Sequence, residues 1–257
     1  FGISNRLDVI RPRDDGLPEA VNSLREAYLG WSGAGENWLF EIGRINLRLG
    51  PSYGYNPTDY FRSGTVRVVT TPDPMAQREN RQGVVMARAQ RLWTGGAASL
   101  ILAPRVRGGS PDAVFSTEFS ATNPEHRALL MASHQLSDAV NGQLVVLFES
   151  SKAPKLGASA TALVNDHLVA HAEVSSEREQ GLFASCAADA SSAAERRRSR
   201  VSAGLTVSLP NRLSVTVEGE YDGHAPELRA WQDLFARSPA RAVGYLQAAQ
   251  FQQQLAA

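Results

Sequence analysis

The stretch VSAGLTVSLPNRLSVTVEGEYD, residues 201–222, contains two runs of alternating apolar and polar residues. The first run extends from Val201 to Leu209, the second from Leu213 to Asp222, and Pro210 and Asn211 separate them. A period of two predicts strands rather than helices. The stretch therefore predicts a β-hairpin with one apolar and one polar face.

The length of each run fits two architectures. A tilted strand of roughly 9–11 residues crosses a bilayer, and an outer-membrane barrel turns its apolar side chains to lipid and its polar side chains to a wet lumen. A soluble sandwich or lipocalin-like barrel has the same alternation with the apolar side chains inward. On this hairpin alone, the soluble architecture is the better interpretation.

The composition excludes several classes of function. The chain has 257 residues, with 26 Lys and Arg against 26 Asp and Glu, so no net charge favours nucleic acid. The basic run RRRSR at residues 196–200 is typical of a loop end or strand rim. Cys186 is the only cysteine, which excludes an intramolecular disulfide. No apolar run approaches 18 residues, so no transmembrane helix is predicted.

Further strands are predicted along the rest of the chain. Between residues 38 and 49 the apolar residues change parity at Gly43, which predicts a β-bulge there and places Arg44, Asn46 and Arg48 on the polar face. A helix-like spacing follows at residues 228–235, and a weak strand is predicted at 241–250. The other predicted strands are residues 3–10, 25–31, 84–93, 97–103, 127–136, 143–150, 158–164 and 167–175.

The lengths of the connections decide between the two architectures. If the strands run up and down, the short turns at 32–36, 94–96, 138–142, 165–166 and 210–211 all fall at one end. The long connections at 50–82, 104–126, 177–200 and 223–240 fall at the other end, with only 151–157 of modest length. A soluble sandwich has no reason to sort its loops this way, whereas outer-membrane barrels have short periplasmic turns and long extracellular loops.

The chain resembles a family of porin-like Gram-negative outer-membrane β-barrels. The stretches that carry the resemblance are LREAYLGW (24–31), EIGRINLRLG (41–50), YNPTDYFR (55–62), RLWTGG (91–96), ALVNDHLVAHAE (162–173) and LSVTVEGEYDGH (213–224). The resemblance implies an all-β, antiparallel up-and-down transmembrane β-barrel, with about 10–12 strands in this chain. It implies a passive or substrate-selective channel in the cell outer membrane and carries over no catalytic residue.

The two ends of the chain lead us to expect part of a longer barrel. The first residues, FGISNRLDVI, lack the charged start and apolar core of a signal peptide. The last residues, QFQQQLAA, lack the terminal aromatic residue with which the final strand of such barrels generally ends. We therefore expect residues 1–257 to form a single barrel domain that is incomplete at one or both ends.

The polar parity of the strands predicts which residues line a pore. Arg44 and Arg88 are expected at similar depth on one wall, with Arg48 nearer the mouth, and Glu218 and Glu220 on a separate wall. Residues 50–82 are long enough to fold inward, and Asn56, Asp59 and Arg62 are the candidates for a constriction. The full set of predicted pore-lining residues is Arg44, Asn46, Arg48, Arg88, Gln90, His171, Glu173, Glu218 and Glu220.

Other chemistry finds little support in the sequence. On a strand, His167 and His171 lie about 13 Å apart at roughly 3.3 Å per residue, too far to chelate one ion. Asp59 and Asp73 fit a hydrolase or divalent-cation site less well than a plain loop. Neither a GxSxG elbow nor a Walker A loop is present. No cofactor, metal or enzymatic activity is therefore expected.

These observations predict a channel for small solutes whose partners are membrane lipid, lipopolysaccharide and the solute, without nucleic acid. Trp31, Trp38 and Trp93 lie near the short turns, as in an aromatic interface girdle. The alternative is a soluble or surface-exposed β-rich module whose long loops bind a ligand without transport.

Overall fold

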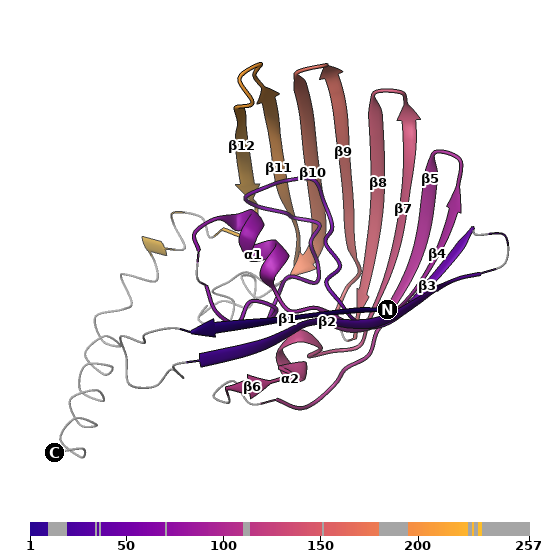
Figure 1. Cartoon of the computed structure of the whole chain (residues 1–257). Coiled ribbons are helices and arrows are strands. Elements are labelled where there is room, and N and C mark those ends of the chain that lie inside the picture. Colours follow the sequence, from indigo (N-terminus) through magenta and orange to yellow (C-terminus); the bar gives the residue numbers. More distant parts are fainter. Residues whose placement is uncertain are drawn as a thin grey trace.

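The structure is a computed structural model that describes residues 1–9, 20–33, 35, 37–69, 71–109, 114–150, 152–179, 195–225, 228 and 231–232. These residues form one 12-stranded sheet, in which the order of neighbours is β1-β2-β3-β4-β5-β7-β8-β9-β10-β11-β12 (Figure 1). Every neighbouring pair on this path is antiparallel, and β6 pairs in parallel with β2. The sheet is not closed into a barrel, because β1 and β12 form its two edges.

The strand bounds follow the alternating runs of the sequence. The strands are β1 Gly2–Val9, β2 Ala20–Ser32, β3 Trp38–Ile45, β4 Val84–Trp93, β5 Gly96–Ala103, β6 Phe115–Ser116, β7 Arg127–Ser137, β8 Val140–Glu149, β9 Lys155–Asn165, β10 Leu168–Glu179, β11 Arg196–Ser208 and β12 Ser214–Asp222. The hairpin predicted at residues 201–222 is confirmed as β11 and β12, with Val201 opposite Tyr221. The basic run at 196–200 forms the first residues of β11.

The predicted sorting of the connections is also confirmed. Because neighbouring strands alternate in direction, the ends of β2, β4, β7, β9 and β11 that lead into short turns all lie at one end of the sheet. The hairpins of β7–β8, β9–β10 and β11–β12 are at the top of Figure 1. The strand ends that the long connections join lie at the opposite end, among them Ile45 and Val84, Ala103 and Arg127, and Glu179 and Arg196.

The two faces of the sheet differ sharply in burial. We call the face that residues 46–83 cover the inner face, and the opposite one the outer face. On β5, Ile101 is fully buried on the inner face, whereas Leu100 and Leu102 are exposed on the outer face. The same contrast separates Leu129 from Leu130 on the paired strand β7. Successive residues of a strand point to opposite faces, so the alternation in sequence becomes this difference between faces.

Residues 46–83, the inner loop, pack against the inner face and complete the hydrophobic core. The side chain of Phe61 is buried in this core, and the Arg127 guanidinium lies 4.7 Å from the centre of its ring. A loop with a buried aromatic anchor packs as part of the protein interior. The core consists of Ile45, Leu47, Leu49, Phe61, Val84, Met86, Ile101, Ala103, Leu129, Val145 and Leu147.

The inner loop contains a short helix, α1 Pro74–Asn80, that was not predicted. Asp73 caps this helix by accepting a hydrogen bond from the Met75 amide at 3.0 Å, and Pro74 begins its first turn. Both residue types favour the start of a helix. Asp73, considered in a hydrolase or cation site, therefore serves as a helix cap. A second short helix, α2 Phe119–Thr122, lies in the connection after β5.

The predicted bulge at Gly43 is wrong. The pairing of β3 with both β2 and β4 continues through Gly43 without a register shift. Gly43 has a φ of +135°, and a Cβ there would lie 2.3 Å from the Ala27 carbonyl oxygen, so close approach explains this glycine. The alternation of side chains between the two faces therefore continues through Gly43. Strand β3 ends at Ile45. The apolar residues Ile45, Leu47 and Leu49 belong to the inner core.

Two further predictions cannot be compared with the structure. The weak strand at 241–250 and most of the helix-like segment at 228–235 lie outside the described residues, as does Cys186. Within the described part of the chain, neither helix has the length and apolar composition to cross a membrane.

Truncating the aromatic anchor should destabilise the fold. Phe61→Ala should lower the free energy of unfolding by about 3–5 kcal/mol, because it leaves a cavity in the core. Urea unfolding measures the effect. Phe115→Ala is the matched control, since Phe115 is 66% exposed, and should change the value by about 0.5 kcal/mol at most. Equal effects for both variants would contradict the assignment of Phe61 to the core.

Candidate functional site

The candidate functional site is the contact between the inner loop and the polar half of the inner face. Register places Ser159, Glu173, Ser202 and Glu220 in one row across β9 to β12, and Thr161, His171, Gly204 and Glu218 in the next row. The first row continues on β8 and β7 with Gln143 and Ser133, whereas the core lies nearer the opposite ends of these strands and includes Val145, Leu147 and Leu129. The inner face therefore has an apolar half and a polar half, and the inner loop contacts both.

Glu173 is the centre of this contact. Its side chain is almost fully buried, and one carboxylate oxygen accepts hydrogen bonds from the Ser52 amide at 2.6 Å and the Asn56 side chain at 3.2 Å. The other oxygen accepts from the Thr58 hydroxyl at 2.8 Å and the Thr58 amide at 3.4 Å. A buried carboxylate is stable only when such donors replace water. Glu173 thereby fixes residues 52–58 across the inner face.

Glu218 provides a second attachment point for the inner loop. Its two carboxylate oxygens accept the amides of Tyr53 and Gly54, each at 2.7 Å. His171 Nε2 lies 2.6 Å from the same carboxylate, so a side chain of β10 reaches a side chain of β12 across β11. Gly204 on β11 permits this approach, because a Cβ there would lie 2.7 Å from His171 Nε2.

A buried ion pair stabilises the inner loop internally. The Arg81 guanidinium donates to both carboxylate oxygens of Asp59, at 2.7 and 3.1 Å. Arg78 Nε lies 3.6 Å from the same carboxylate, and Arg78 Nη2 donates to the carbonyls of Leu49 and Gly50. Burial lowers the pKa of the Arg78 guanidinium, and the Asp59 carboxylate opposes that shift. Asp59, considered in a hydrolase or cation site, is therefore a structural partner of two arginines.

Tyr60 joins the inner loop to the sheet between these polar and ionic contacts. Its hydroxyl lies 2.9 Å from the Ser175 hydroxyl on β10. Burial raises the pKa of the Tyr60 phenol above its ordinary value, and the hydrogen bond with Ser175 opposes that rise. Tyr60 therefore remains neutral and can act as a hydrogen-bond donor at this contact.

The structure brings together five of the predicted residues. His171, Glu173 and Glu218 lie on the inner face, and Asn56 and Asp59 lie in the inner loop that covers it. The inward path of residues 50–82 thus places the expected constriction segment against the expected wall. Arg62, the third constriction candidate, is exposed at the edge of this contact.

The predicted basic strip of Arg44 and Arg88 is not formed. Register places Arg88 opposite Glu41 and Arg44 opposite Val85, so the two arginines lie three positions apart and on opposite faces. Arg88 pairs with Glu41 at 3.1 Å on the inner face. Arg44 is buried, and its guanidinium donates to the carbonyls of Gly83 and Thr117. The expectation failed because it relied on the bulge at Gly43.

The remaining predicted residues occupy varied positions. Asn46 donates to the Arg78 and Glu79 carbonyls and accepts from Arg81, so it anchors the inner loop. Arg48 is half-exposed and lies 3.7 Å from Glu79. Gln90 lies on the inner face opposite Ser99, and Glu220 lies there opposite Ser202.

Several residues of the contact were missed by sequence reasoning. Arg78 and Arg81 bind Asp59 and loop carbonyls, and Thr58 and Tyr60 reach β10. The signal available for the arginines was Asp73-Pro74, a helix start that places Arg78 and Arg81 nearly one turn apart. No local pattern indicated the contacts of Thr58 and Tyr60, because their partners lie more than a hundred residues away.

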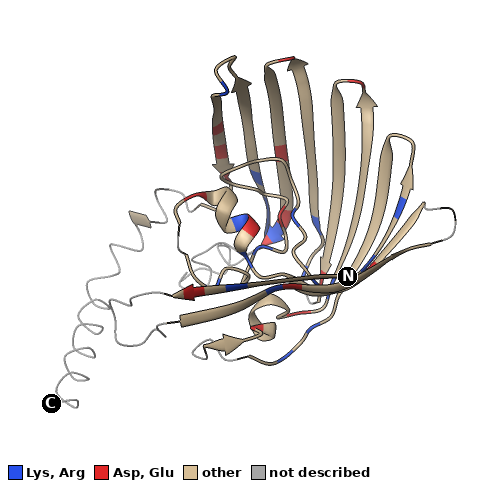
Figure 2. Ribbon diagram, viewed as in Figure 1, with Lys and Arg blue, Asp and Glu red and all other residues tan. Residues whose placement is uncertain are grey.

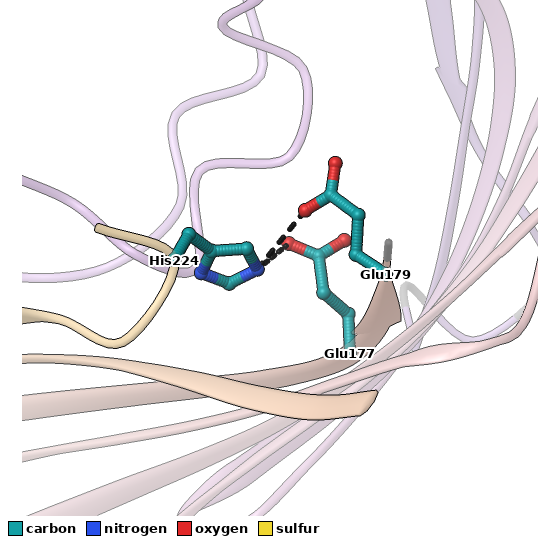
Figure 3. A group of neighbouring side chains, drawn as sticks. All are labelled: Glu177, Glu179 and His224. Atoms are coloured by element: carbon teal, nitrogen blue, oxygen red, sulfur yellow. Dashed lines mark ion pairs between the residues drawn. The ribbon is translucent and has the colours of Figure 1, made fainter. Parts of the chain in front are cut away.

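A second polar cluster lies at the last residues of β10 and just after β12. Glu177, Glu179 and His224 point towards one another, with His224 Nε2 at 3.3 and 3.0 Å from the two carboxylates (Figure 3). These residue types can bind a metal ion. However, Lys155 and Arg200 each lie 2.7 Å from the Glu177 carboxylate and already compensate its charge. We therefore interpret the cluster as an ion-pair network that joins β10 to the end of β12.

Glu173→Gln tests whether this carboxylate holds the inner loop. The glutamine side chain replaces one carboxylate oxygen with an NH2 group, which would face a donor of Ser52 or Thr58 instead of accepting from it. Hydrogen exchange of the Ser52 and Thr58 backbone amides should therefore accelerate at least about tenfold. Mass spectrometry of peptides that contain residues 52–58 measures the exchange rate. Glu195→Gln is the control, since Glu195 is exposed, and should leave exchange unchanged. Unchanged exchange in Glu173→Gln would show that other contacts hold the loop.

Comparison with protein-family models, curated proteins and solved structures found no match to this chain. The porin-like resemblance therefore stays a prediction.

Proposed function

We propose that this chain forms part of the wall of an outer-membrane β-barrel channel for small solutes. The observation that carries the proposal is the polarity of the sheet, whose outer face exposes large apolar side chains while its inner face carries buried carboxylates. The exposed apolar residues of β5, β7, β8, β9, β11 and β12 include Leu100, Leu102, Leu130, Leu144, Phe148, Leu156, Leu205, Val215 and Val217. An apolar surface of this extent indicates contact with lipid or another apolar partner.

The distribution of charge supports lipid as that partner. Lys, Arg, Asp and Glu gather around α1 and the nearby strand ends, whereas long stretches of β5, β7, β8 and β9 carry none (Figure 2). Strands β8, β9 and β10 have 10, 11 and 12 residues, enough to span a bilayer when tilted. An uncharged band as high as these strands are long matches the thickness of the hydrocarbon layer of a bilayer.

Aromatic residues at the short-turn end support the same orientation. Trp31 and Trp38 each stack on Phe40, with ring centres 5.6 and 6.0 Å from that of Phe40. All three side chains lie on the outer face. Trp93 ends β4 at the same end of the sheet and is partly exposed. Outer-membrane barrels carry such aromatic girdles at both interfaces.

Completing the barrel requires more strands than the sheet contains. Eleven strands lie on the antiparallel path from β1 to β12, so these two edge strands run in the same direction. An odd number of additional strands would therefore close the wall with antiparallel pairs throughout, giving the even total of bacterial barrels.

The inner loop gives the proposed channel its restriction. It crosses the inner face from the core at Phe61 to the carboxylates at Glu173 and Glu218. A solute moving along this face would have to pass the segment 52–58. The alternative of a ligand-binding module with apolar side chains packed inward has less support, because the apolar parity of these strands is exposed.

Arginine substitutions on the two faces test the lipid contact. Leu205 is 49% exposed on the outer face, and Leu205→Arg should destabilise the protein by about 2–4 kcal/mol in a bilayer. The neighbouring Thr206, whose hydroxyl lies 2.9 Å from that of Thr216 on the inner face, is the matched position. Thr206→Arg should cost far less, measured by folding titrations into lipid vesicles. A larger loss at Thr206 would mean that the faces are reversed.

Release of the inner loop tests the restriction. In planar bilayers, Glu173→Gln in the full-length protein should conduct more than the wild type, because segment 52–58 loses its attachment. Glu195→Gln should conduct as the wild type does. If the wild type and Glu173→Gln both insert without conducting, the channel proposal is wrong, whereas equal non-zero conductances would remove only the restricting role of the loop.

A further inference from the structure

Two arginines lie side by side on the outer face, where β10 ends and β11 begins. The register pairs Arg178 of β10 directly with Arg197 of β11. Both have the parity of the outer-face residues Val174 and Val201, and both are exposed. Side chains directly opposite one another on antiparallel strands have Cβ atoms roughly 5 Å apart. The pair therefore concentrates two positive charges at one place on the apolar face.

No acidic residue of the outer face compensates this pair. From β8 to β12, the outer-face positions of the described strands carry no other charged side chain. The neighbouring arginines of the basic run lie on the inner face, where Arg200 pairs with Glu177 at 2.7 Å and Arg196 lies opposite Glu179. The basic run thus divides between the two faces, and only its inner-face arginines lie beside carboxylates.

The two outer-face arginines retain free donors. Arg197 Nε donates to the Ser176 hydroxyl at 2.8 Å. Among the described residues, neither the terminal nitrogens of Arg197 nor the Arg178 guanidinium contact an acceptor. Like charges directly opposite one another on neighbouring strands are destabilising. A bound anion would remove that repulsion, and the donors of a guanidinium match the oxygens of a phosphate.

The adjoining rows of the outer face indicate what carries the anion. Next to the arginines lies the hydroxyl row of Ser176 and Ser199. The row after it consists of Val174, Val201 and Tyr221, and Tyr221 is 63% exposed. Cationic, hydroxyl, and then apolar and aromatic side chains thus follow one another along the strands. A membrane lipid has the matching order of anionic headgroup, interfacial region and acyl chains.

We propose that Arg178 and Arg197 form a binding site for the phosphate group of an anionic membrane lipid. The two guanidinium groups donate to the oxygens of one phosphate, and the acyl chains pack along Val174, Val201 and Tyr221. The bound lipid neutralises both arginines at the ends of β10 and β11. The site rests on the proposed function only in placing the outer face against lipid.

Lipid titration of the full-length protein in dodecyl maltoside tests the site, because this detergent carries neither charge nor phosphate. Native mass spectrometry measures the bound fraction. Dioctanoyl phosphatidic acid should bind saturably and at least about tenfold more tightly than dioctanoyl phosphatidylcholine, which has the same chains without net charge. Inorganic phosphate at the same concentration as the lipid should not displace it, since the free ion makes no contact with the apolar row.

Substitution of the arginines should weaken the binding of phosphatidic acid. Arg197→Gln should weaken it about fivefold, and the double variant Arg178→Gln with Arg197→Gln at least about tenfold, because each change removes one cation from the site. Arg196→Gln is the matched control. It removes the same charge from an exposed position one residue away on β11, but on the inner face, and should leave binding unchanged.

Three outcomes would overturn the lipid site. Equal affinity for the two lipids would leave a solvated pair of arginines, and this comparison uses the wild type alone, so it does not depend on the folding of a variant. Equal weakening by Arg196→Gln and Arg197→Gln would show a general effect of charge. Displacement of the lipid by inorganic phosphate would show a site for the free ion. Since binding is measured without conductance, failure of the lipid site is distinguishable from failure of the channel.

Discussion

A buried carboxylate on the sheet requires donors that the sheet itself does not supply. Serines lie beside Glu173 on both neighbouring strands, yet its hydrogen bonds come from Ser52, Asn56 and Thr58. A carboxylate left without these donors would be strongly destabilised in the protein interior. The path of the inner loop is therefore coupled to the position of one charge on β10, and Glu218 and Tyr60 reinforce that path.

The same loop also completes an apolar core on the other half of the inner face. Phe61 packs among residues of β4, β5, β7 and β8, and the buried ion pair of Asp59 and Arg81 lies beside it. Removing water from an ion pair is costly, so the bidentate geometry and the carbonyl partners of Arg81 are needed for it to be tolerated. The inner loop thus folds as part of the sheet's interior, and its sequence combines polar anchors with one aromatic anchor.

The outer face, unlike the inner face, exposes apolar side chains that are stabilised by an apolar environment. Its exposed leucines and valines have no covering element among the described residues, while the inner face holds the hydrogen-bonded carboxylates. A protein in water gains free energy by burying apolar surface, whereas a bilayer offers that surface a favourable solvent. The proposed channel is consistent with this arrangement, because a polar solute would travel along the polar face.

The sequence by itself determined the strands, their alternation and the sorting of the turns, because these depend on neighbours within a few residues. The hairpin of β11 and β12 and the bounds of β4 followed from local patterns alone. Only the tertiary structure decided that Gly43 is a close approach to Ala27 rather than a bulge, which moved Arg44 away from Arg88. It also decided which donors satisfy Glu173 and that Arg178 lies opposite Arg197, since these contacts join residues far apart in the chain and periodicity carries no information about them.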